Sequence, residues 1–287
     1  MIRSAVALLC VIRLVAADPP KPSVPKTTPE LEQAIRKVLA ENKTPGAGVA
    51  IVSREHVLWT AGIGKADVAA GTDVTPDTLF RIGSVTKSFV SLSVLRLQEQ
   101  GRLHLSDSAH SLAPEIWFHN PWESTDPVRV VHLLEHTAGF DDLHLKEYAS
   151  SDPTPMTLRA GLDYHPDSRI SRWRPGTFFS YSYCNSGPAF AAYVVQKVTG
   201  QRFEDYVQEN FFQPLRLDTV SFFLTPDVEK KLTRLYRPDG RTPYPYWHIT
   251  MSSGRGERFG AGDGKLRSVL PEPRFVRRRT ACARCIH

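Results

Sequence analysis

A serine and a lysine spaced three residues apart are the strongest candidates for chemistry in this sequence. Ser84 and Lys87 form an S-x-x-K pattern at the start of a predicted amphipathic helix over residues 84–100. Residues three apart on a helix share a face, so the Lys87 amine can reach the Ser84 hydroxyl. A serine hydroxyl is a poor nucleophile unless a neighbouring base takes its proton. The pair therefore predicts a nucleophilic serine, and the alternative is a helix start followed by a solvated lysine.

Two further motifs carry polar side chains. Tyr183-Cys184-Asn185 follows a turn at Pro175-Gly176. Between that motif and the S-x-x-K pattern lies HLLEHTAGF, residues 132–140, whose first five residues also fit the H-x-x-E-H zinc-protease pattern. A motif needs matching structural context, so we favour a structural turn over a metal site. In that turn we expect His136 to hydrogen-bond the backbone.

Four segments in order carry a family resemblance. FRIGSVTKSF, VRVVHLLEHTAGF, PGTFFSYSYCNSG and VTGQRFEDYVQENFFQPL resemble the serine β-lactamase-like superfamily, in particular class C β-lactamases, family VIII carboxylesterases and DD-peptidase-related proteins. The resemblance covers residues 46–217 and implies an α+β fold, an antiparallel sheet flanked by helices with a helical subdomain. It implies a hydrolase that works through an acyl-enzyme on small-molecule esters, β-lactams or D-Ala-type peptides, without a cofactor or a metal.

The resemblance also implies a role for each motif residue. Ser84 matches the acylated nucleophile, and Lys87 matches its proton-handling partner. Tyr183 matches the tyrosine that acts as general base on Ser84 and then as acid on the leaving group, and Asn185 matches the residue that orients Lys87 and the substrate. The family's usual distance from the Pro-Gly turn selects Tyr181 instead. Because Asn185-Ser186-Gly187 anchors the motif better, we prefer Tyr183.

Periodicity predicts the elements that position these residues. An early helix, a pair of strands and three later helices are expected at residues 30–42, 48–53, 57–62, 128–135, 189–198 and 203–212. In the helix over residues 84–100 we expect Phe89, Leu92, Leu95 and Leu97 to form the buried side. These elements and the motifs together make up a β-lactamase-related domain over residues 30–251.

A third family element is missing from the sequence. The resemblance implies a K-T-G or H-x-G strand beside the site, then further strands and a closing helix, and residues 218–287 contain no such motif. His248 lacks the required glycine. Residues 252–287 are Gly- and Arg-rich, which predicts either a shifted reading frame or a disordered basic tail. Translation of the other two frames past codon 251 tests the first idea, which fails if neither frame encodes the missing strand.

The missing strands have a physical consequence. Only two strands of the sheet are expected before residue 251, and a two-stranded ribbon is marginally stable alone. We therefore expect the chain to be poorly soluble and weakly active or inactive, and robust Ser84-dependent turnover of a nitrophenyl ester would contradict this. A catalytically impaired member that serves as a binding or assembly module is the alternative, which a fully functional Ser84→Ala protein would support.

Composition is that of an ordinary globular protein. Hydrophobic residues make up 41% and charged residues 23% of the 287 residues, and no apolar run is long enough to span a membrane. The net charge of +6 lies in residues 252–287, which hold nine Lys or Arg against three acids, so the other 251 residues are neutral. A nucleic-acid binder acting through this tail is therefore disfavoured, because the tail lacks interleaved aromatic residues.

The N-terminus resembles a secretory signal. Arg3 precedes an apolar stretch over residues 4–12, and small residues at 15–17 predict cleavage after Ala17. Residues 1–17 are thus interpreted as a signal peptide and residues 18–29 as a flexible lead-in, which predicts a secreted or periplasmic protein. The alternative is a frayed N-terminal tail. The single CxxC at Cys282 and Cys285 is weak evidence for zinc.

Overall fold

The computed structural model describes residues 24–142, 149–152, 154, 156–164, 166–177, 181–250 and, as backbone, 257–260. Its helices are α1 (Thr28–Glu41), α2 (Lys87–Glu99), α3 (Ala109–Leu112), α4 (Val130–Leu134), α6 (Leu158–Asp163), α7 (Ser186–Thr199), α8 (Phe203–Val207) and α9 (Pro226–Glu229). Its strands are β1 (Gly46–Val52), β2 (Val57–Asp67), β3 (Thr72–Asp73), β4 (Leu79–Arg81), β5 (Ala149–Ser150), β6 (His248–Ile249) and β7 (Glu257–Gly260). The expected signal peptide and the CxxC pair lie outside the described residues.

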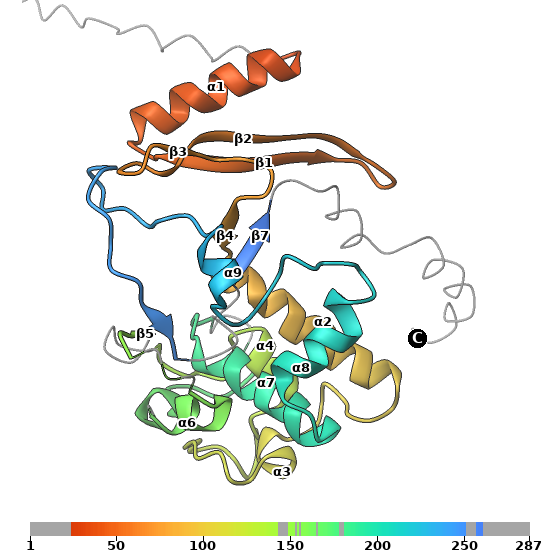
Figure 1. Cartoon of the computed structure of the whole chain (residues 1–287). Coiled ribbons are helices and arrows are strands. Elements are labelled where there is room, and N and C mark those ends of the chain that lie inside the picture. The colour runs from red at the N-terminus through yellow and green to blue at the C-terminus, as the bar shows by residue number, and fades with distance from the viewer. Residues whose placement is uncertain are drawn as a thin grey trace, which may run out of the picture.

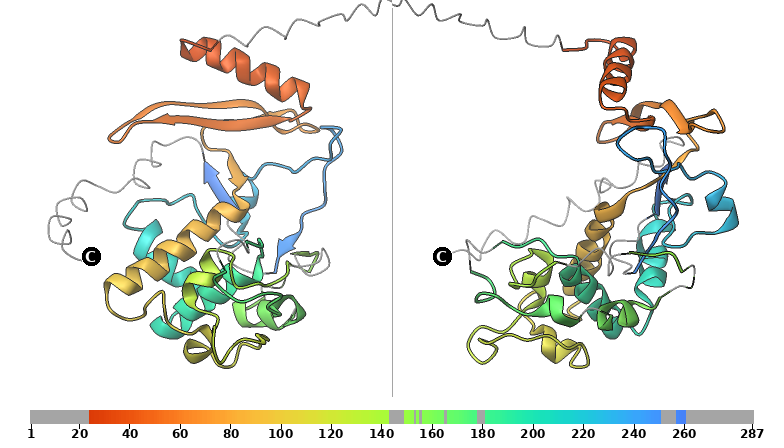
Figure 2. Two further views of the ribbon diagram at one scale, coloured as in Figure 1. Left: turned by 180° about the vertical axis from the view of Figure 1, so that it is seen from behind. Right: turned by 90° about the vertical axis from the view of Figure 1, so that its left-hand side faces the viewer.

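The elements form three layers. α1 lies across one side of the sheet β1–β2–β3, and the remaining helices gather on its other side (Figures 1 and 2). α1 begins after Thr27, whose hydroxyl accepts a hydrogen bond from the Glu30 N–H at 3.3 Å. None of the helices in the described part of the chain is long and apolar enough to cross a membrane.

The sheet has one strand more than we expected. β1 and β2 pair antiparallel from Gly46 opposite Gly64 to Val52 opposite Val57. β2 continues beyond this pairing to Asp67 and there pairs with the two-residue strand β3. The expectation of only two strands was therefore wrong. β3 escaped notice because two residues cannot show an alternating pattern, and its pairing depends on the length of β2.

Two short ribbons join distant parts of the chain. β4 pairs with β7, and β5 pairs with β6, both antiparallel. β7 lies within residues 252–287, where a disordered tail was one of the two alternatives, and for these four residues the structure differs from that alternative. β7 was not predicted because such a short strand is held by its backbone ladder with β4 rather than by an apolar pattern.

α7 is the centre of the helical layer. It contacts α2, α3, α4, α6 and α8, and its residues 186–195 are all buried. Over these buried residues α7 carries mainly small and apolar side chains on every face, which is the composition expected of a helix enclosed by others. It ends at Gly200 in the left-handed conformation (φ +74°).

α2 buries a different face from the one expected. Phe89 and Leu97 are buried, but Leu92 and Leu95 are 41% and 43% exposed. The buried face instead includes Ser93, whose hydroxyl donates to the Phe89 carbonyl at 2.7 Å. The prediction was wrong for Leu92 and Leu95. The pattern did not reveal that Ser93 can be buried, because its hydroxyl is satisfied by a hydrogen bond within the helix.

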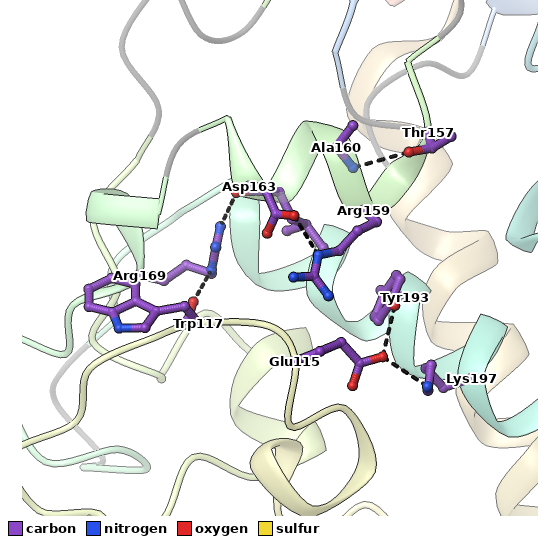
Figure 3. Close-up of polar contacts among 10 residues, drawn as sticks. Glu115, Trp117, Thr157, Arg159, Ala160, Asp163, Arg169, Tyr193 and Lys197 are labelled. Atoms are coloured by element: carbon purple, nitrogen blue, oxygen red, sulfur yellow. Dashed lines mark hydrogen bonds and ion pairs between the residues drawn. The ribbon is translucent and has the colours of Figure 1, made fainter.

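A polar network ties α7 to its surroundings (Figure 3). Glu115 accepts from Lys197 at 2.8 Å and from the Tyr193 hydroxyl at 2.9 Å. The bond from Lys197 lowers the pKa of Glu115 to about 2. Nearby, the fully buried Arg169 donates from Nε to the Trp117 carbonyl at 2.9 Å. These contacts join segments of the helical layer that are far apart in sequence.

Candidate active site

Ser84 lies in a 3₁₀ turn between a strand and a helix. The turn η1 (Gly83–Thr86) follows β4, and α2 begins only at Lys87. β4 is fixed on both sides, because it pairs with β7 and because Leu79 exchanges backbone hydrogen bonds with the segment that follows α9. Ser84 is exposed, whereas Lys87 is half-buried and donates from Nζ to Ser84 Oγ at 3.1 Å. The chain thus presents the serine hydroxyl on a rigid support.

Tyr183 reaches the serine from the other side. Its hydroxyl lies 2.7 Å from Ser84 Oγ, and Lys87 Nζ lies 5.3 Å from the centroid of its ring. Tyr181, the alternative motif tyrosine, is 65% exposed, and its ring makes an edge contact with His136 at 5.8 Å. Of the two candidates, Tyr183 is therefore the one that the structure brings to Ser84.

Asn185 holds Lys87 in place. Lys87 Nζ donates to Asn185 Oδ1 at 2.7 Å, and Asn185 is only 9% exposed. On its other side Asn185 donates to Asp142 Oδ1 from the backbone N–H at 2.9 Å and from Nδ2 at 3.0 Å. Asp142 was not among the residues predicted from the sequence. It lies 43 positions from Asn185, and only its place two residues after the HTAGF turn offered a signal.

His136 supports the segment that carries Tyr183. Its Nδ1 accepts from the Cys184 N–H at 3.2 Å, and its ring packs against the Tyr183 ring with centroids 4.5 Å apart and planes tilted by 30°. We had expected His136 to hydrogen-bond the backbone of its own turn. It instead accepts from a backbone N–H that is distant in sequence. Burial, aided by the Lys87 charge, lowers the pKa of His136, so this ring is neutral near pH 7.

The H-x-x-E-H pattern does not gather a metal site in the described part of the chain. No group of three His, Cys, Asp or Glu side chains there is placed to hold an ion. His132 Nδ1 accepts from the Arg129 N–H at 3.2 Å, so both histidines of the pattern bind backbone donors. The His132 ring packs closely against Gly176, because a Cβ added to this glycine would lie only 2.7 Å from His132 Nε2.

The region beyond the Y-x-N motif contributes differently from the family expectation. His248 lies in β6, paired with β5, and its ring contacts Tyr246 at 4.7 Å. β7 pairs with β4, which ends three residues before Ser84. β7 thus lies beside the strand that leads into the Ser84 turn, although the sequence of β7 contains neither K-T-G nor H-x-G.

The arrangement can move a proton away from a serine oxygen. Lys87 donates to Ser84 Oγ, which leaves the serine hydrogen free to point at the Tyr183 oxygen. A cation beside an attacking oxygen also stabilises the negative charge that develops there. These contacts form one continuous chain from Tyr183 through Ser84 and Lys87 to Asn185.

Comparison with known proteins shows the family of the chain. The profile of the Beta-lactamase family matches residues 31–270, a longer stretch than residues 46–217, over which the motifs carry the resemblance. The chain is 34% identical over 211 residues to a protein named Beta-lactamase from Yersinia enterocolitica, covering 74% of this chain and 50% of that one. It is 26% identical over 221 residues to Protein flp from Staphylococcus aureus strain N315, covering 75% and 42%. The chain thus spans about half the length of these relatives.

Solved structures share the fold. An octameric penicillin-binding protein homologue from Pyrococcus abyssi superposes with a TM-score of 0.71 at 27% identity, covering 84% of this chain and 55% of that one. The D-alanine carboxypeptidase AmpC from Burkholderia cenocepacia gives a TM-score of 0.66 at 22% identity, covering 84% and 62%. The fold is the α+β β-lactamase/DD-peptidase-like fold that the four motifs predicted. The chain therefore belongs to the Beta-lactamase family.

Proposed function

We propose that this chain is a serine hydrolase that forms an acyl-enzyme on Ser84. The observation that carries the proposal is the position of Ser84 Oγ, which lies 2.7 Å from the Tyr183 hydroxyl and 3.1 Å from Lys87 Nζ. A nucleophile within hydrogen-bond reach of a base, which is itself oriented by a third group, is the signature of nucleophilic catalysis. Tyr183 is that base, and Lys87 is the third group: its Nζ lies 5.3 Å from the centroid of the Tyr183 ring and donates to Asn185 Oδ1 at 2.7 Å.

The reaction has two balanced steps. In acylation, Ser84 Oγ bonds to the substrate carbonyl carbon and its proton passes to the Tyr183 oxygen; Tyr183 then gives that proton to the leaving alcohol or amine as the bond between the carbonyl carbon and the leaving group breaks. In deacylation, a water oxygen bonds to the acyl carbon and its proton passes to the Tyr183 oxygen. Tyr183 gives that proton to Ser84 Oγ as the ester bond to Ser84 breaks and the carboxylic acid product leaves. Lys87 stabilises the developing negative charge in both steps. No cofactor is required by this scheme.

The substrate is proposed to be a small ester, β-lactam or D-Ala-type peptide. Each of these presents a carbonyl to the serine and releases an oxygen or nitrogen leaving group. Relatives named as a β-lactamase and as a D-alanine carboxypeptidase support this range. Among these, we favour an ester or a broad hydrolase activity, of the carboxylesterase kind, over antibiotic resistance.

Covalent trapping tests the proposal directly. Incubation with a fluorophosphonate or a labelled penicillin, followed by peptide mass spectrometry, is expected to place the adduct on Ser84. Ser84→Ala should remove the adduct. Ser88→Ala, an exposed serine in α2, is the matched control and should keep it. An adduct that survives Ser84→Ala, or a wild-type chain that forms none, would contradict the proposal.

We also propose that the protein is secreted, on the pattern of residues 1–17. A protein recovered from the extracellular or periplasmic fraction is expected to begin at Asp18. Recovery of the intact N-terminus from the cytoplasm would refute this. Turnover of a nitrophenyl ester by the purified chain tests the separate prediction that its activity is weak.

A further inference from the structure

We propose that Asp142 is a positioning residue that sets the direction of the Asn185 side-chain amide and thereby holds Lys87 on Ser84. This inference rests on the proposed function and deepens it. Asp142 does not touch the reacting atoms. It lies two residues after the HTAGF turn and is half-buried beside Asn185.

The geometry assigns the amide orientation. Asp142 Oδ1 lies 3.0 Å from Asn185 Nδ2 and 2.9 Å from the Asn185 N–H, and Oδ2 lies 3.4 Å from Nδ2. An ionised carboxylate only accepts hydrogen bonds, so the amide must turn its NH₂ group toward Asp142. The amide oxygen then faces the opposite way, where Lys87 Nζ lies 2.7 Å from it.

Removal of the carboxylate would free this amide. The two ends of an asparagine amide have nearly the same shape, so a half-turn about its last bond is sterically easy. That half-turn would place the NH₂ group against the Lys87 ammonium, two donors facing each other. Asn185 is 9% exposed, so water has little room to restore the lost contact. Lys87 would then lose the acceptor that holds it beside Ser84.

The same carboxylate also anchors backbone, which is the competing explanation. Asn185 is the N-cap residue of α7, and its N–H donates to Asp142. A purely structural role predicts a loss of stability with an unchanged acylation rate per folded molecule. A positioning role predicts a slower acylation rate in protein that is still folded. These two expectations can be separated by experiment.

Two substitutions and one matched control provide the test. Asp142→Ala removes every acceptor, whereas Asp142→Asn keeps one carbonyl oxygen that can face the Asn185 amide. Asp141→Asn is the control, because Asp141 is exposed and its Oδ1 accepts a hydrogen bond from the Asp142 N–H at 2.9 Å, which an asparagine Oδ1 can also accept. A neutron crystal structure of each folded variant, in which the amide hydrogens are visible, gives the Asn185 orientation, and fluorophosphonate labelling gives the acylation rate on Ser84.

We expect Asp142→Ala to break the contact between Lys87 and Asn185 and to slow labelling about 10- to 100-fold. Asp142→Asn should lie between Asp142→Ala and the wild type, and Asp141→Asn should match the wild type. An Asp142→Ala protein that keeps Asn185 Oδ1 on Lys87, or labels at the wild-type rate per folded molecule, would overturn the inference. If the wild type itself forms no adduct, the proposed function fails, and the crystal structures alone decide the role of Asp142.

Discussion

Replacement of Tyr183 by phenylalanine removes one oxygen and leaves the rest of its environment in place. The lost oxygen lies 2.7 Å from Ser84 Oγ, whereas the ring that packs against His136, with centroids 4.5 Å apart, remains. General acid–base catalysis contributes about 10²- to 10⁴-fold to a rate. The acylation barrier should therefore rise by about 3 to 5 kcal/mol. Folding loses one hydrogen bond at a side chain that is 38% exposed, which costs about 0.5 kcal/mol.

Tyr181→Phe is the matched control for this change. Tyr181 also contacts His136 through its ring, is two residues away, and is 65% exposed. We expect Tyr183→Phe to slow fluorophosphonate labelling of Ser84 at least 100-fold with a melting temperature within about 3 °C of the wild type. Tyr181→Phe should leave both values unchanged. Loss of labelling in Tyr181→Phe, or labelling of Tyr183→Phe within threefold of the wild type, would refute the assigned base.

Two stability measurements test the surroundings of the site. Burial lowers the pKa of both His132 and His136 from the ordinary value of 6.5. As the pH drops from 6.5 toward the pKa values of the folded chain, the unfolded chain binds more protons than the folded one, so the free energy of unfolding should fall. A free energy of unfolding from urea denaturation that stays constant between pH 7.5 and 5 would contradict this. Gly139→Ala should destabilise more than Gly101→Ala. Both glycines have positive φ (+77° and +68°), but only a Cβ on Gly139 meets backbone, 2.9 Å from the Trp173 oxygen, so equal losses in urea denaturation would show that this contact can relax.

Local patterns were enough to predict most long elements and the contact between Ser84 and Lys87. The S-x-x-K spacing acts within one turn, so the contact between Ser84 and Lys87 follows from helix geometry. The predicted strands and helices also appear, with shifted ends: residues 48–53 became β1, and residues 189–198 became α7. These elements are long and strongly patterned, which is where sequence reasoning performs best.

Contacts between distant segments could not be predicted in the same way. Asp142 and Asn185 meet only because the helical layer folds the HTAGF turn against the start of α7. β3 and β7 are too short for a pattern, and each is held by a partner strand elsewhere in the chain. His136 was expected to hydrogen-bond the backbone of its own turn, and it instead accepts from the Cys184 N–H. In each case the missing information is tertiary packing, which no spacing of residues along the chain records.

The burial of α7 has a consequence for local motion. The contacts at Ser84 come from the start of α2 and from the segment leading into α7, and α2 packs on α7. Opening of the β1–β2 ribbon alone would leave these contacts intact, because the ribbon supplies none of the described ones. In native-state hydrogen exchange, the amides of α7 should therefore exchange only when the whole molecule unfolds, while those of the sheet exchange through smaller openings. The contacts of Ser84 with Tyr183 and Lys87 would then stay formed while the sheet opens.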